Sequence, residues 1–232
     1  MLEADLRAHP GAPWEQPARA WLRQMKHLRR AAGPVRDLDV HRKLLEDWVG
    51  KEPPDSEEEK LDAWLKDERR RLAHGVQKQI RKKQRGLTER QAAFLAAFAR
   101  KPRMRTPRPA DSVALEGFVR AADAMPVLDA ENLHDFRKAT KQVRYIAESG
   151  AQGEVATALK RIQDAIGEWH DWLCLWQEAK SALGEDAPGL TDAFEREVER
   201  HFAAAMKTTQ TMRARLTGEW MASRGKRLAS AS

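Results

Sequence analysis

Apolar residues recur every three to four positions along most of the chain, a period that predicts α-helices. The predicted helices cover residues 18–49 with an end or a kink at Gly33-Pro34, then 57–85, 88–99, 113–124, 131–149, 152–183 and 189–222. Proline and glycine mark residues 1–17 as a loop after a short helical segment, and a tail from Arg224 is expected to fray. Ser56 and Glu59 have the spacing of a capping box at the start of the predicted helix 57–85.

Composition supports an all-α fold, because Ala, Leu, Arg, Glu, Lys and Gln dominate and strand-favouring runs are nearly absent. The hydrophobic share of 41% is sufficient for a core. The single cysteine excludes an intrachain disulfide, and no apolar run approaches the roughly 18 residues of a membrane span. These features predict a protein with no membrane partner and a cytoplasmic location.

One predicted helix, residues 133–148, separates apolar from basic residues. Leu133, Phe136 and Val143 lie on one side of a helical wheel and predict the face that packs on a core. The opposite arc of about 120° is the second-half stripe, formed by His134, Arg137, Lys138, Lys141, Arg144 and Tyr145. Like charges at this spacing repel, and acidic residues appear only at its edges, so the stripe predicts a surface for an acidic polymer.

A second basic row lies in the first predicted helix. It is named here the first-half stripe and consists of Arg19, Arg23, Lys26 and Arg30, again with no acidic residue expected among them. The chain carries a formal charge of +7, and residues 1–110 hold 26 Lys and Arg against 16 Asp and Glu. Residues 111–232 hold 16 against 19, so the second-half stripe does not come from a generally basic background.

The two halves of the sequence repeat at an offset of 134 residues. The segment from Lys26 overlays the segment from Lys160, with Gly33 on Gly167 and Asp37 on Asp171. Repeats of this kind predict two similar helical bundles related by an approximate two-fold. The predicted domains are a first bundle at 1–100, a basic Pro-rich linker at 101–112 and a second bundle at 113–224.

Three segments resemble the CHAD family, an α-helical domain named for its histidines. LHDFRKATKQVRYIAE followed by LKRIQDAIGEWHD is similar to the family's second repeat, and LRRAAGPVRDLDV is similar to the first. The resemblance implies two pseudo-symmetric bundles of antiparallel helices around a basic groove that binds inorganic polyphosphate. It also implies that some members associate with polyphosphate granules, and that sulfate or phosphate mimics the ligand.

By this resemblance, His134, Arg137, Lys138, Lys141, Arg144 and Lys160 match the family's basic positions, and Arg23, Lys26 and Arg30 match those of the first half. The first repeat would begin with a helix equivalent to residues 133–148, which residues 1–7 do not supply. The first bundle is therefore expected to lack its N-terminal helix. A homodimer would rebuild the missing part of the basic surface.

The residues suit phosphate recognition, because Arg offers a planar fork for two oxygens and Lys a mobile point charge. A neighbouring polyanion would raise the pKa of His134 and make it a second donor, whereas a neutral His134 that packs near the helix start is the alternative. No catalytic, cofactor or metal site is predicted, since the His-Asp doublets lack converging partners and no P-loop is present. Nucleic-acid binding, or a scaffold for an acidic protein partner, remain open alternatives to polyphosphate.

Overall fold

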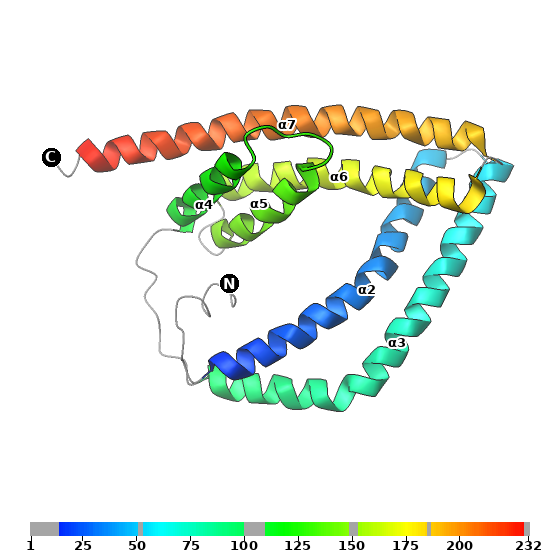
Figure 1. Ribbon diagram of the computed structural model, residues 1–232, viewed down its shortest axis with the longest axis horizontal. Helices are drawn as coiled ribbons and strands as arrows, with labels where there is room; N and C mark the ends of the chain where they lie inside the picture. Colours follow the sequence, from blue (N-terminus) through cyan, green and yellow to red (C-terminus); the bar gives the residue numbers. More distant parts are fainter. Residues whose placement is uncertain (1–13, 51–52, 100–109, 149–152, 185–186, 230–232) are drawn as a thin grey trace. The chain divides into compact units, whose positions relative to one another are not determined.

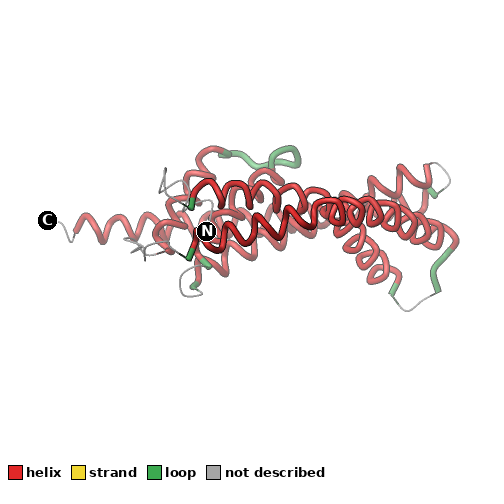
Figure 2. The backbone as a smooth tube through the Cα atoms, turned by 90° about the horizontal axis from the view of Figure 1, so that it is seen from below, coloured by secondary structure: helices red, strands yellow, loops and turns green. Residues whose placement is uncertain are grey.

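The computed structural model describes residues 14–50, 53–99, 110–148, 153–184 and 187–229, in which every regular element is an α-helix (Figures 1 and 2). The helices are α2 (Glu15–Val49), α3 (Ser56–Phe98), α4 (Ala110–Ala124), α5 (Leu133–Ala147), α6 (Glu154–Leu183) and α7 (Pro188–Ala229). The all-α prediction is confirmed for this part of the chain. The predicted N-terminal helical segment and most of the linker, residues 101–109, lie outside the described residues.

The chain divides into two compact units, and each contains two separate stretches of sequence. Unit 1 consists of residues 1–105 and 178–190, and unit 2 of residues 106–177 and 191–232. The chain therefore leaves unit 1, forms most of unit 2, and returns to unit 1 before it completes unit 2.

Unit 1 is built on α2 and α3, which run antiparallel beside each other (Figure 1). Between residues 14 and 98, the buried apolar side chains are few for helices of this length: Trp14, Ala18, Leu38, Leu45, Leu61 and Leu65. Trp14 and Ala18 form a separate cluster against Leu22, Phe94 and Ala97 near the start of α2 and the end of α3. His41 is also buried, and its Nδ1 lies 2.8 Å from the carboxylate of Glu178.

Acidic side chains fix the starts of α3 and α7 within unit 1. Asp55 accepts hydrogen bonds from the backbone N–H groups of Glu57 and Glu58, and the Glu58 carboxylate accepts one from the Asp55 N–H at 2.9 Å. This is a capping box one residue earlier than the predicted Ser56–Glu59 pair. Glu57 accepts a hydrogen bond from the Leu190 N–H at 2.9 Å, so its carboxylate satisfies a first-turn donor of α7.

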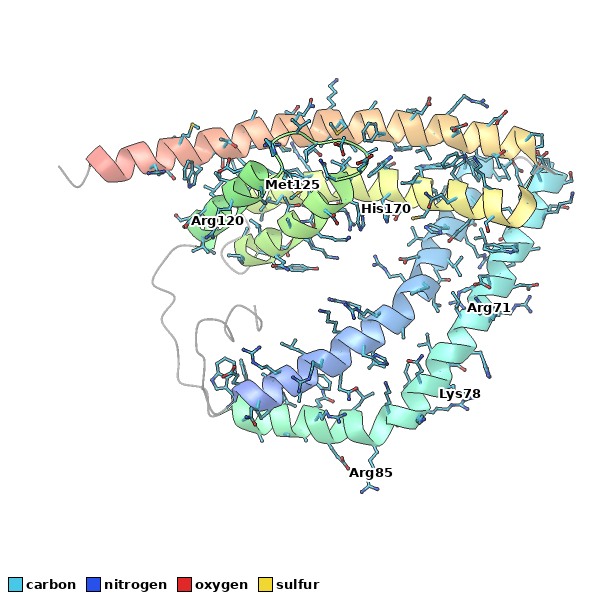
Figure 3. All side chains as sticks on the ribbon, in the orientation of Figure 1. Arg71, Lys78, Arg85, Arg120, Met125 and His170 are labelled. Atoms are coloured by element: carbon cyan, nitrogen blue, oxygen red, sulfur yellow. The ribbon has the colours of Figure 1, made fainter. Side chains whose placement is uncertain are left out.

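The predicted separation of two helices near Gly86 is wrong, and the helix does not end at Gly33-Pro34, the first of the two predicted alternatives there. The helix α2 continues through Gly33-Pro34, although proline removes one hydrogen bond of the ladder. The helix α3 continues through Gly86, where the sequence predicted separate helices at 57–85 and 88–99, and it bends near Arg85 (Figures 1 and 3). Pro17, predicted to lie in a loop, occupies the first turn of α2, where a missing N–H costs no helical bond.

Two predicted boundaries also differ in the second half. The last residues of the predicted linker, 110–112, belong to α4. The predicted frayed tail is mostly helical, because α7 continues to Ala229, and residues 230–232 lie outside the described residues.

Unit 2 has a continuous apolar core formed by α4, α5 and parts of α6 and α7. Its fully buried large side chains include Phe118, Leu133, Phe136, Leu159, Ile162, Ile166 and Leu216. Arg213 of α7 donates to the carbonyls of Ala122 at 2.7 Å and Met125 at 3.0 Å, and so satisfies carbonyls at and beyond the end of α4. Burial at about 25 cal/mol per Å² of apolar surface makes this core the main stabilising contribution in unit 2.

Candidate anion-binding site

The packing of α5 determines which side chains of the second-half stripe reach solvent. Leu133, Phe136 and Val143 are buried as predicted, and the Thr140 hydroxyl donates to the Phe136 carbonyl at 3.0 Å. The opposite face carries Lys138 and Tyr145, both exposed. The predicted orientation of this helix is therefore confirmed.

Arg137 is held against the backbone of α6. Its Nε donates to the Gln163 carbonyl at 3.2 Å, and its guanidinium covers Gly167. A Cβ atom on residue 167 would lie only 3.0 Å from Arg137 Nη2, closer than side chains normally approach. Gly167 thus provides the space for Arg137, which orients the cation without neutralising it.

His134 packs on a histidine that the sequence prediction did not connect to it. The rings of His134 and His170 of α6 (Figure 3) lie 4.0 Å apart between centroids at 33°. Burial, followed by the neighbouring His170, Lys138 and Arg137, lowers the pKa of His134 to about 4. His134 Nδ1 is buried and has no hydrogen-bond partner among the residues that the structure describes. Without a bound anion, the ring is therefore neutral at neutral pH.

Several predicted cations have acidic partners, which corrects the expectation that the stripes are without acidic relief. The pairs are Arg19–Glu15 at 2.7 Å, Lys138–Asp135 at 2.9 Å, Arg144–Glu148 at 3.4 Å and Lys160–Asp164. Each pair joins residues three or four positions apart on one helix. The exposed pairs of Lys138 and Lys160 contribute only about 0–1 kcal/mol each, so an incoming anion can replace their carboxylates at little cost.

The remaining predicted cations have no carboxylate at ion-pair distance within the described part of the chain. These are Arg23, Lys26 and Arg30 of α2, and Arg137 and Lys141 of α5. The α5 residues and Lys160 belong to unit 2, whereas the α2 residues belong to unit 1. The structure thus provides two groups of unneutralised cations, one on each unit.

The sequence prediction missed three basic residues that accompany Arg23 in unit 1. His27 of α2, and Lys83 and Arg90 of α3, line a pocket of about 220 Å³ together with Arg23, Ala20 and Gln24. The basic run from Lys78 to Arg85 was a visible signal for Lys83. The sequence gives no register between two antiparallel helices, however, so this grouping became evident only in the folded hairpin.

No helix in the described ranges combines the length and the apolar character needed to cross a membrane.

Comparison with known proteins gives one match. No curated protein and no solved structure matches the chain. The family model described as CHAD domain matches residues 6–180; this is generally a non-catalytic binding domain, and no catalytic family is identified. Because that match covers well over half of the sequence, the chain belongs to the CHAD domain family.

Proposed function

We propose that this protein is a non-enzymatic module that binds inorganic polyphosphate through basic residues of both helical repeats. The observation that carries the proposal is the pair Arg137 and Lys141, which lie on a firmly packed helix without carboxylate partners in the described residues. Polyphosphate presents regularly spaced anionic oxygens and no base edges, so cations spaced one helical turn apart suit it. The proposal includes association of the protein with polyphosphate granules. It also includes a homodimer, which would extend the basic surface.

Two features support the pseudo-symmetric repeat that the proposal includes. Gly50 and Gly184, 134 residues apart, both end helices with positive φ, at 71° and 57°. The same offset pairs the buried Leu38 with Trp172 and the buried Leu45 with Ala179. Shared backbone conformation and shared burial at one offset are typical of duplicated helical pairs.

Arg137→Ala/Lys141→Ala is expected to raise the Kd for long-chain polyphosphate about fivefold at moderate salt, equivalent to about 1 kcal/mol. The reason is the loss of two unneutralised cations from α5. Isothermal titration calorimetry measures the change. Arg120→Ala/Lys207→Ala is the matched control, because it removes the same charge from exposed positions of unit 2 and is expected to change Kd less than twofold.

Equal affinities for the wild type and the Arg137/Lys141 variant would contradict the proposal. Competition separates the alternatives, because RNA that displaces polyphosphate at comparable phosphate concentration would favour a nucleic-acid function. Capture of an acidic protein that polyphosphate does not displace would favour a scaffold function instead.

Gly167→Val tests the position of Arg137 without any change of charge. The added methyl groups occupy the space of the guanidinium, so we expect Arg137 to swing away and Kd for polyphosphate to rise about threefold. Gly218→Val on α7 is the control, since a Cβ at residue 218 meets no atom within 4 Å. An unchanged Kd in Gly167→Val, with an unchanged melting temperature, would show that the orientation of Arg137 is irrelevant to binding.

A further inference from the structure

Unit 1 contains a small basic pocket between α2 and α3, named here the α2–α3 pocket. Its lining consists of Ala20, Arg23, Gln24, His27, Lys83 and Arg90, and its volume is about 220 Å³. No carboxylate belongs to this lining. The volume lies below the roughly 300–1,000 Å³ of sites for drug-sized molecules, so the pocket suits a small polar group.

Helical periodicity explains why these side chains meet. Arg23 and His27 lie one turn apart on α2, and Lys83 and Arg90 lie two turns apart on α3. Gly86 lies between the two α3 residues on the same face, and a Cβ there would be 3.4 Å from Arg90 Nη1. The absence of a side chain at Gly86 therefore gives the Arg90 guanidinium room beside the helix.

Aromatic packing holds the two helices together next to the pocket. The rings of Trp21 and Phe94 stack with centroids 6.5 Å apart and an angle of 6° between their planes. Phe94 also contacts Phe98, at 5.3 Å between centroids. These contacts fix the separation of α2 and α3 where Arg23 faces Arg90, so the pocket has a rigid support.

The charge balance of the pocket differs from that of the rest of α3. Arg69 pairs with Asp39, Arg70 with Asp67, Arg71 with Glu68 and Arg85 with Glu89. In contrast, Arg23, Lys83 and Arg90 have no carboxylate at ion-pair distance within the described ranges. Three cations converge here without a countercharge, and a bound anion would relieve their repulsion.

We propose that the α2–α3 pocket is an anion site that binds a single phosphoryl group of a polyphosphate chain. The proposal rests on the proposed function for the identity of the ligand, but it joins Arg23 of the first-half stripe to three further residues, His27, Lys83 and Arg90, in one site. Arg23 and Arg90 each offer a planar fork to the phosphoryl oxygens, Lys83 adds a point charge, and His27 adds a ring donor. The site would hold the chain end or a short phosphate oligomer on unit 1.

Titration of the full-length chain with inorganic triphosphate tests the pocket, because a short oligomer depends most on a single site. Lys83→Ala/Arg90→Ala is expected to raise the Kd for triphosphate at least fivefold. The matched control is Lys78→Ala/Arg81→Ala, which removes the same charge from exposed positions of α3. At about 100° per residue, these positions lie more than about 120° around the helix from Lys83, so their effect should stay below twofold.

The outcomes separate this proposal from the proposed function. One outcome would overturn the pocket and leave the proposed function intact. In it, Arg137→Ala/Lys141→Ala loses affinity for long-chain polyphosphate, whereas Lys83→Ala/Arg90→Ala has the same Kd for triphosphate as its control variant. Failure of triphosphate to bind the wild type would also overturn the pocket. If circular dichroism shows that the alanine variant is unfolded, Lys83→Gln/Arg90→Gln retains more of the side chains and must show the same fivefold loss.

Discussion

Phe136→Ala is expected to lower the free energy of unfolding of unit 2 by about 3–5 kcal/mol. Phe136 is fully buried, and its ring meets that of Phe118 edge to face, with centroids 6.1 Å apart and an angle of 74°. Removal of the ring leaves a cavity in the core that the surrounding helices fill only partly. Because Phe136 anchors the same helix that carries Arg137 and Lys141, the variant also tests whether core packing positions the basic face.

Urea unfolding followed by circular dichroism measures this loss, with the midpoint and slope compared between variants. Tyr145→Ala is the control on the same helix, since its side chain is 44% exposed and its loss should cost less than about 1 kcal/mol. A loss of less than about 1 kcal/mol in Phe136→Ala would contradict the observed packing of α5.

Acidification is expected to destabilise the protein through His134 by about 2 kcal/mol between pH 6.5 and pH 4. The folded state lowers the pKa of His134 from 6.5 to about 4, chiefly by burial and then by His170, Lys138 and Arg137. Between these two values the unfolded chain binds the proton more readily, so the stability is fully present above pH 6.5 and is lost as the pH falls to 4. The figure of 2 kcal/mol allows for screening by solvent at a partly exposed ring.

The measurement compares the free energy of unfolding at pH 7 and at pH 4.5 for the wild type and for His134→Gln. The variant should lose less stability on acidification, because glutamine does not titrate. His74→Gln, at an exposed histidine of α3, controls for removal of a histidine as such and should follow the wild type. Identical acid sensitivity in the wild type and His134→Gln would show that folding does not lower the pKa of His134.

The helices of the second half were predictable because they depend on short-range signals. Periodic apolar residues, with loops after Met125 and around Gly184, give α4 to α7 boundaries within a few residues of those observed, except at the end of α7. The separation predicted at Gly86 was wrong, and α2 does not end at Pro34, because such residues carry only a local cost, about 1 kcal/mol for a helical glycine and about 3 kcal/mol for a helical proline. Pairing of α2 with α3 along their length outweighs this cost.

The sequence predicted which helix faces carry the basic residues of the candidate site, but not the contacts that these residues make with other helices. The spacing of Asp135 to Lys138, and of Lys160 to Asp164, was available in the sequence and indicates the ion pairs that the structure shows. The contact between His134 and His170 joins residues of different helices, and so does the seating of Arg137 on Gly167. Contacts of this kind depend on how α5 lies across α6, which no local pattern specifies.

The return of the chain to unit 1 has a consequence for its synthesis. Two interactions of unit 1, His41 with Glu178 and Glu57 with Leu190, join residues 137 and 133 positions apart. A ribosome releases the first partner of each long before the second, so α2 and α3 emerge when the segment that completes their unit does not yet exist. Unit 1 therefore reaches its final form only after residue 190 has been translated, and the nascent hairpin must remain unaggregated throughout that interval.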